Sequence, residues 1–235
     1  MDRILEAEWL DELPPEDPRA VRSRRDLRRV NRWMGHTGRL VRMLALRLQR
    51  QTPSSILELG AGDGTLLLTV AQQLAAAWPP GAPGPVVRLV DRQDLVDPGT
   101  LRAYRQLGWR VEVIRSDVFD YLKSAPVVDW VIANLFLHHF DSVRLEELLR
   151  AAAGSARLFA ALEPRRSAVG LLGSRMLWAI GCNDVTRHDA VVSVRAGFRG
   201  RELTRLWPEM GRWEAIERPA GIFSHEFLAR RREDL

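Results

Sequence analysis

Three glycines between an apolar segment and a helix-forming segment constrain the fold of this chain more than any other feature. In ILELGAGDGTLLLTVA (56–71), a run typical of a strand ends at Gly60, and Gly62 and Gly64 follow at alternate positions. Glycine adopts the left-handed conformations of a tight turn and lets a ligand approach the backbone closely. A helix-forming segment begins directly after the third glycine. This pattern predicts a nucleotide-binding turn at the carboxyl edge of a parallel sheet.

The rest of the chain continues the alternation of apolar strands and helical segments. Strands are expected at 54–60, 86–91, 110–117, 127–135 and 156–164, with helical segments between them. Such spacing produces parallel βαβ units. Two final strands, 212–219 and 223–231, are joined by a turn too short for a parallel crossover, so they pair antiparallel. We predict an α/β fold: a Rossmann-like, doubly wound, seven-stranded, mostly parallel sheet with an antiparallel terminal hairpin and an N-terminal helical cap.

We expect the chain to divide after residue 50. Residues 1–50 form an acidic leader and a helical cap, and residues 51–235 form the main domain. The main domain comprises a cofactor-binding half (51–164), a substrate lid (about 165–208) and a terminal hairpin (212–232).

Composition excludes several other classes of protein. Hydrophobic residues make up 46% and charged residues 28% of the 235 residues, which excludes a disordered or low-complexity chain. Cys182 is the single cysteine and therefore has no partner for an internal disulfide. The most apolar segment, 167–181, is interrupted by Arg175 and is too short to cross a bilayer. The acidic N-terminus does not resemble a secretory signal, so we expect a cytoplasmic protein.

The charge of the glycine loop decides between two kinds of ligand. Glu58 ends the predicted strand, Asp63 lies inside the loop, and Thr65 stands where a dinucleotide-binding motif has its third glycine. Two carboxylates would repel a pyrophosphate at the helix N-terminus. A ligand that carries an ammonium and a sulfonium group would instead be attracted by Glu58. S-adenosylmethionine (SAM) is such a ligand, and we predict it as the cofactor.

Residues at the ends of the next strands match this ligand. Asp91 can accept hydrogen bonds from both ribose hydroxyls, Asp117 can accept one from the adenine amino group, and Val118 can pack on the ring. Across residues 54–164 the chain resembles class I SAM-dependent methyltransferases of the small-molecule type, related to quinone- and polyketide-modifying enzymes. The resemblance implies a cofactor site made of Glu58, Gly60, Ala61, Gly62, Gly64, Asp91, Arg92, Asp117, Val118, Asn134 and Leu135.

Three histidines are candidates for a catalytic role. His138 and His139 directly follow the fourth strand, in LFLHHFD, and so are expected at the mouth of the crevice. An imidazole suits proton abstraction from a phenol or an enol. His188 lies in the polar segment TRHDAVVSVRAGFRGREL (186–203), which resembles a segment that covers the acceptor in small-molecule methyltransferases. No third ligand stands at a recognisable spacing from the histidine pair, so no metal site is expected.

The expected function is methyl transfer from SAM to a small hydrophobic acceptor that is phenolic, polyketide-like or quinone-like. An RNA or protein methyltransferase stays open as an alternative, because residues 19–50 hold eleven arginines and a single acid, Asp26. A module that binds the cofactor without catalysis also stays open. We favour a small-molecule partner over nucleic acid, because only Trp33 interleaves with the arginines to stack on bases. The sequence leaves the choice between a monomer and a homodimer open.

Overall fold

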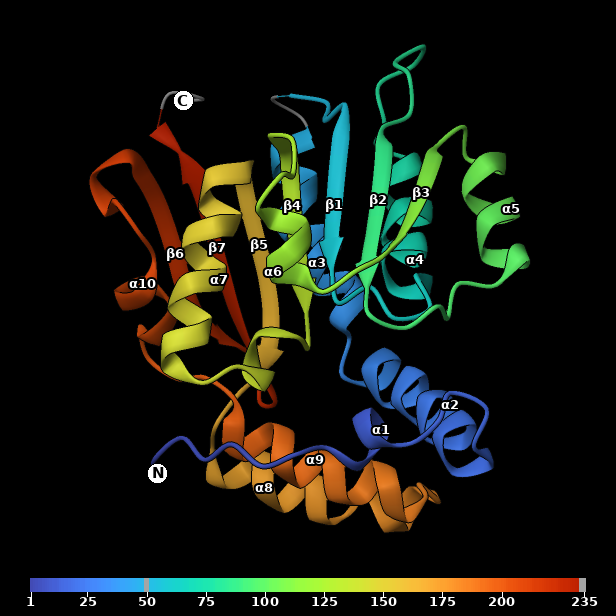
Figure 1. Ribbon diagram of the computed structural model, residues 1–235, viewed down its shortest axis with the longest axis vertical. Helices are drawn as coiled ribbons and strands as arrows, with labels where there is room; N and C mark the ends of the chain where they lie inside the picture. The colour runs from blue at the N-terminus through green and yellow to red at the C-terminus, as the bar shows by residue number, and fades with distance from the viewer. Residues whose placement is uncertain (49–50, 233–235) are drawn as a thin grey trace.

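The structure is a computed structural model that describes residues 1–48 and 51–232. Its described strands form one sheet in the order β3-β2-β1-β4-β5-β7-β6 (Figure 1). The five strands from β3 to β5 pair in parallel, and β7 lies antiparallel between β5 and β6. The strands are β1 (Ser55–Leu59), β2 (Val86–Asp91), β3 (Arg110–Arg115), β4 (Val128–Asn134), β5 (Ala156–Pro164), β6 (Trp213–Ala220) and β7 (Ser224–Arg231). The predicted α/β sheet and its terminal hairpin are confirmed.

Helices cover both faces of the sheet, as expected for a doubly wound fold (Figure 1). One face packs against α3 (His36–Leu48), α4 (Thr65–Ala75) and α5 (Pro98–Gln106). The opposite face packs against α6 (Val118–Leu122), α7 (Ser142–Ser155) and α10 (Glu202–Leu206). Each face therefore has its own hydrophobic core.

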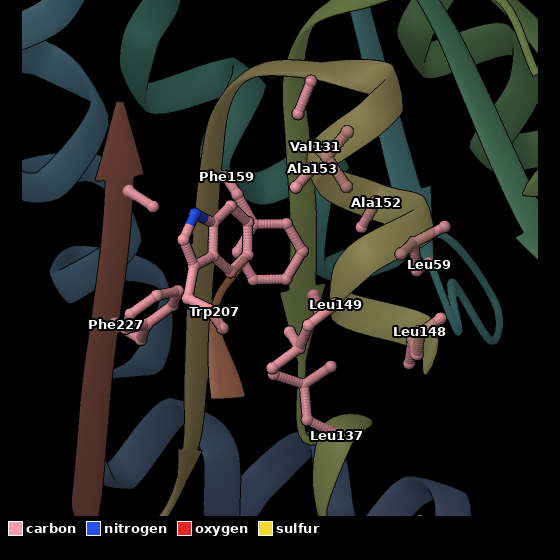
Figure 2. Close-up of a cluster of buried hydrophobic side chains, with 14 of the residues drawn as sticks. Leu59, Val131, Leu137, Leu148, Leu149, Ala152, Ala153, Phe159, Trp207 and Phe227 are labelled. Carbon is pink, nitrogen blue, oxygen red and sulfur yellow. The ribbon is translucent and has the colours of Figure 1, made fainter. Parts of the chain in front are cut away.

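An aromatic cluster fixes the terminal hairpin to the sheet (Figure 2). The Trp207 ring lies 5.0 Å from that of Phe159 on β5 and 5.2 Å from that of Phe227 on β7, between ring centroids. All three side chains are buried, and buried aromatic side chains contribute large apolar areas to a core. The cluster explains why β7 lies beside β5, because the apolar residues of β7 are buried. On β6, the exposed Glu214, Arg218 and Pro219 suit an edge strand.

A separate layer lies beyond the carboxyl ends of the parallel strands (Figure 1). It contains the N-terminal segment with α1 (Trp9–Glu12), followed by α2 (Pro18–Trp33), α8 (Ala168–Arg175) and α9 (Asp184–Ala196). Three short 3-10 helices complete the described elements: η1 (Leu137–His139), η2 (Leu177–Ile180) and η3 (Met210–Arg212). None of the helices in the described ranges has the length and apolar character needed to cross a membrane.

The structure differs from the sequence-based expectation in three details. The apolar segment 167–181, whose sequence also favours one continuous helix, breaks at Met176 into α8 and η2. The polar segment after it forms the regular helix α9. The second helix of the expected cap, α3, packs on the sheet beside α4 through its buried leucines. The predicted division after residue 50 lies at the edge of residues 49–50, which are outside the described ranges.

Candidate functional site

A cavity of about 2060 Å³ lies between the carboxyl ends of the parallel strands and the covering layer. Ligand pockets commonly occupy about 300–1,000 Å³, so this chamber has room for two ligands. Its wall takes residues from the glycine loop, the ends of β2 and β4, the N-terminal segment, α2, α8 and α9. Most of the predicted cofactor residues meet there: Glu58, Gly60, Ala61, Gly62, Asp91, Arg92, Asp117, Val118, Asn134 and Leu135 line it.

The glycine loop has the backbone geometry that the sequence predicts. Gly60, Gly62 and Gly64 have φ angles of 66°, 55° and 69°, in the left-handed region that favours glycine. A Cβ atom on Gly60 would lie 2.2 Å from the Phe136 ring, so a side chain is also excluded there by contact. Gly64 does not line the chamber, and it serves the turn into α4.

Glu58 is a buried carboxylate whose Oε2 has no hydrogen-bond partner among residues 1–48 and 51–232. Burial, reinforced by the charges of Asp63 and Asp91, raises the pKa of Glu58 well above its usual range. A buried acceptor without a partner is costly, and such groups in native proteins point to a role in binding. The geometry therefore favours a ligand that presents a cationic N–H group to Glu58.

Asp91 ties the end of β2 to the glycine loop. Its Oδ2 accepts a hydrogen bond of 2.9 Å from the Gly62 backbone N–H, and its Oδ1 accepts one of 2.9 Å from Gln93. Each carboxylate oxygen has a further lone pair for a ligand hydroxyl. Asp91 can thus hold the loop and a ligand at the same time, and Arg92 beside it is exposed on the chamber wall.

The remaining predicted cofactor residues lie at the ends of β3 and β4. Asp117 caps α6 by accepting a 2.8 Å hydrogen bond from the Phe119 N–H, and Val118 beside it is buried. Asn134 is the last residue of β4. Leu135 follows with a φ of 51°, a conformation that is uncommon for residues other than glycine and is often found at functional sites.

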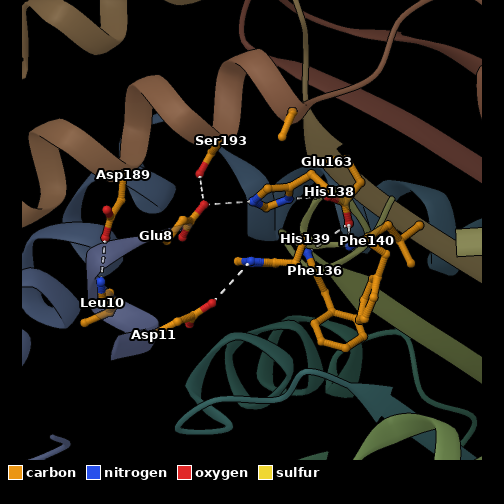
Figure 3. Close-up of polar contacts among 12 residues, drawn as sticks. Glu8, Leu10, Asp11, Phe136, His138, His139, Phe140, Glu163, Asp189 and Ser193 are labelled. Atoms are coloured by element: carbon orange, nitrogen blue, oxygen red, sulfur yellow. Dashed lines mark hydrogen bonds and ion pairs between the residues drawn. The ribbon is translucent and has the colours of Figure 1, made fainter. Parts of the chain in front are cut away.

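His138 lies between two carboxylates (Figure 3). Its Nδ1 is 2.8 Å from Glu163 Oε2 and its Nε2 is 3.3 Å from Glu8 Oε1. Burial alone would lower the pKa of His138, but the hydrogen bonds to Glu163 and Glu8 outweigh it and raise the pKa to about 9. Burial likewise opposes ionisation of Glu8, but its hydrogen bond with His138 lowers the Glu8 pKa to about 2. His138 is therefore an imidazolium at neutral pH, paired on both sides.

The other two candidate histidines have different surroundings. His139 lines the chamber with a ring that is 27% exposed, and its Nδ1 is 3.5 Å from Asp11 Oδ2. His188 is not among the residues that line the chamber. Its Nδ1 is 2.9 Å from Asp189 Oδ1, and its ring stacks on Trp9 with centroids 3.9 Å apart.

Sequence reasoning missed the N-terminal segment as part of the site. Asp189 on α9 accepts hydrogen bonds from the N–H groups of Trp9 (2.8 Å) and Leu10 (3.0 Å), and Ser193 donates one of 2.5 Å to Glu8 (Figure 3). These contacts fasten residues 1–12 across the chamber (Figure 1). Glu8 and His138 are 130 positions apart, so no motif spacing could have joined them. The seven acids of residues 1–17 were the only signal.

Comparisons of the sequence with models of protein families and with curated proteins give no match. Solved structures do share the fold. The plantazolicin methyltransferase BpumL in complex with SAH aligns with a TM-score of 0.62 at 13% identity, over 92% of each chain. BamL, a plantazolicin methyltransferase in complex with a triazolic desmethylPZN analog and SAH, aligns at 0.63 and 12% identity, over 94% of this chain and 92% of that one.

A third structure extends the likeness to a different acceptor. Magnesium protoporphyrin IX methyltransferase (ChlM) from Synechocystis with bound SAH aligns with a TM-score of 0.53 at 13% identity, over 84% of this chain and 83% of that one. At such low identity these likenesses establish the Rossmann-like methyltransferase fold of the chain, including its antiparallel hairpin.

Proposed function

We propose that this protein is an enzyme that transfers a methyl group from SAM to a small hydrophobic acceptor, phenolic, polyketide-like or quinone-like. The observation that carries the proposal is the buried, unpartnered Oε2 of Glu58 beside the glycine loop. A nucleotide with a pyrophosphate would add negative charge next to Glu58, Asp63 and Asp91, whereas the methionine ammonium of SAM would supply the missing donor. The structural neighbours named above, crystallised with SAH, support the same cofactor.

In this proposal, different cofactor residues bind different parts of SAM. Glu58 and the glycine-loop backbone hold the methionine part, Asp91 the ribose, and Asp117 with Val118 the adenine. Asn134 and Leu135 form the floor, and Arg92 flanks the ribose. When bound, SAM supplies a methyl group that is already activated by its sulfonium. The chain then has to orient the acceptor in line with that methyl group and exclude water.

The acceptor side of the chamber is mostly apolar. Leu27 and Val30 on α2, Met34 at its C-cap, and Leu177 and Ile180 on η2 line it and favour a hydrophobic acceptor. Polar lining on this side comes from the α2 residues Arg24, Arg28, Arg29 and Arg32. We propose His139 as the histidine that contacts the acceptor, because it lines the chamber with a partly exposed ring. His138 is enclosed by Glu8 and Glu163, and it positions the N-terminal segment. His188 supports the same segment through Trp9 and Asp189.

Radiolabelled methyl transfer distinguishes the acceptor classes. Purified protein is incubated with methyl-labelled SAM and, in separate reactions, with a panel of phenols and quinols, total RNA, and a protein extract. We expect label in organic-extractable small molecules and none above background in RNA or protein. Label confined to RNA or protein would refute the small-molecule assignment. SAM binding without label in any pool would favour a non-catalytic module.

A further inference from the structure

We propose that Glu8, His138 and His139 form a binding site for a divalent transition-metal ion on the wall of the chamber. One carboxylate oxygen of Glu8 and one ring nitrogen of each histidine lie within 4.8 Å of one another. Two imidazoles and a carboxylate are donors that Zn²⁺, Co²⁺, Ni²⁺ and Fe²⁺ prefer over the oxygen-only sets of Mg²⁺ or Ca²⁺. Glu8, His138 and His139 all line the chamber, so an ion there would have positions open to a ligand.

The orientation of His138 is the first argument for the site. Glu163 Oε2 holds Nδ1 at 2.8 Å, and Glu163 Oε1 is itself fixed by the N–H groups of Phe136 (3.0 Å) and Leu137 (2.9 Å). A carboxylate that accepts the Nδ1–H of a histidine is the usual outer partner of a metal-binding imidazole, because it fixes the tautomer and aims Nε2 at the ion. Here Nε2 is aimed at Glu8 (Figure 3).

The separation of the two donor atoms is the second argument. In the ligand-free protein the proton on His138 Nε2 supplies the positive charge between this nitrogen and the Glu8 carboxylate. A metal ion would displace that proton and bind the lone pairs of both groups. Their 3.3 Å separation is longer than the ~2.7–2.9 Å typical of a charge-assisted N–H···O bond. Two ligand atoms about 2.0–2.1 Å from a tetrahedral ion lie about 3.3 Å apart.

The surrounding charges also favour a cation. The carboxylates of Glu8, Glu163 and Asp11 contact the two imidazoles. Arg3 and Arg92 act on Glu163 and Asp11, whereas the positive charges that act most strongly on Glu8 are the two histidines. Ser193 donates a hydrogen bond to Glu8 and holds that carboxylate toward His138. His139 has to turn toward the pair to complete the set, and its partly exposed ring at the end of η1 has room to do so.

The existence of the site does not depend on methyl transfer. An ion at this site would also be placed to bind an oxygen of the acceptor. This second step rests on the proposed function, because it requires the acceptor to occupy the same chamber. The test therefore measures metal binding and SAH binding separately, and neither measurement uses enzymatic activity.

The probe is Co²⁺, added to untagged, chelator-treated protein and followed by its visible absorption, with Zn²⁺ competition as a second readout. We expect one Co²⁺ per chain with the bands of nitrogen-coordinated cobalt, displaced by Zn²⁺. Glu8→Gln and His139→Gln are each expected to weaken Co²⁺ binding at least about tenfold, or about 1.4 kcal/mol. Glu12→Gln, which removes an exposed carboxylate of the same segment outside the cluster, is expected to bind Co²⁺ as the unsubstituted protein does.

SAH calorimetry on each variant shows whether its fold and cofactor site are intact. Absence of Co²⁺ bands in the unsubstituted protein would overturn the proposal. The proposal would also be overturned if Glu8→Gln or His139→Gln bound Co²⁺ with unchanged affinity. If Co²⁺ binds as expected and SAH does not, the proposed function fails and the metal site stands.

Discussion

The carboxylate of Glu58 occupies a position in which ligand binding and protein stability oppose each other. Its side chain is buried at the end of β1, Oε2 lacks a donor, and burial raises its pKa. A carboxyl whose folded-state pKa is raised destabilises the fold once it ionises, because the unfolded chain keeps the charge in water. Under the proposed function, the bound cofactor would supply the missing partner of this costly group.

Glu58→Gln is therefore expected to stabilise the ligand-free protein at pH 8 and to leave its stability nearly unchanged near pH 4. The gain in the free energy of unfolding begins as pH rises through the pKa of Glu58 in the unfolded chain, about 4.3. It is complete above the raised pKa of Glu58 in the folded protein. The same substitution should weaken SAH binding at least about tenfold, since a hydrogen bond to a charged group contributes ~1.5–3 kcal/mol. Thermal unfolding at the two pH values and SAH calorimetry measure both effects. Equal or lower stability of Glu58→Gln at pH 8 would count against this interpretation of Glu58.

Asp91→Ala removes an acceptor for the ribose and a contact that holds Gly62. We expect the affinity for SAH to fall at least about tenfold, because the lost hydrogen bond to a charged group contributes ~1.5–3 kcal/mol. Asp91→Asn keeps one oxygen for the loop and is expected to lose less. Circular dichroism controls for the fold. An unchanged SAH dissociation constant in the folded alanine variant would show that Asp91 does not contact the cofactor.

Sequence reasoning succeeded for residues whose role follows from local chain geometry. The glycines of the loop and Asp91 each stand at the end of a strand or at the turn after it, so the βα pattern alone places them at one edge. It failed for Glu8 and Glu163, which contact His138 from two distant segments. Such contacts depend on how the covering layer packs, and no period or spacing encodes that.

At the scale of elements, the first 48 residues contain two parts with different roles. Residues 1–12 are held to α9 and η1 by polar contacts, including hydrogen bonds from Arg3 to the carbonyls of His138, Phe140 and Ala196. By contrast, α3 is part of the sheet's core, where Leu40, Leu44 and Leu48 are buried. Removal of all 50 N-terminal residues would thus expose one face of the sheet, so the shorter segment is the informative deletion.

Deletion of residues 1–12 is expected to raise the KM for the acceptor at least about tenfold while the SAH dissociation constant changes less than about threefold. The reason is that this segment covers the chamber near the histidines, whereas the predicted cofactor residues all lie on the sheet side. Steady-state kinetics and calorimetry on the same preparation separate the two constants. Loss of SAH binding with an unchanged acceptor KM would contradict the assignment of this segment.

The arginines of α2 give the element-scale test of the RNA alternative. Arg28 pairs with Asp63 of the glycine loop at 2.6 Å, and Arg29 with Asp26 at 3.2 Å. The Arg28–Asp63 pair lies at the surface and contributes at most about 1 kcal/mol. Asp26 is buried, but it keeps a hydrogen bond from the Asn183 N–H when Arg29 is replaced. Replacement of Arg24, Arg25, Arg28 and Arg29 by Gln is therefore expected to leave acceptor turnover within about fivefold. RNA binding that falls steeply with salt and disappears in the quadruple variant would instead identify an RNA-directed enzyme.

At the scale of the whole molecule, the sheet was predictable because its signals are repeated. Continuous apolar runs, turn glycines and helical segments each indicate the same βαβ units, and a parallel crossover has one favoured hand. The position of β7 between β5 and β6 was not predictable from the hairpin alone, because it depends on the cluster of Phe159, Trp207 and Phe227. The chamber likewise arises only when α2, α8, α9 and the N-terminal segment assemble over the sheet.

In the proposed function this chamber binds SAM and its demethylated product, SAH. Isothermal titration calorimetry of the purified full chain with SAH tests it most directly. We predict one SAH per chain with a micromolar dissociation constant, roughly −8 kcal/mol, and a large loss of that affinity in Glu58→Gln. Binding of NADH with no response to SAM or SAH would contradict it.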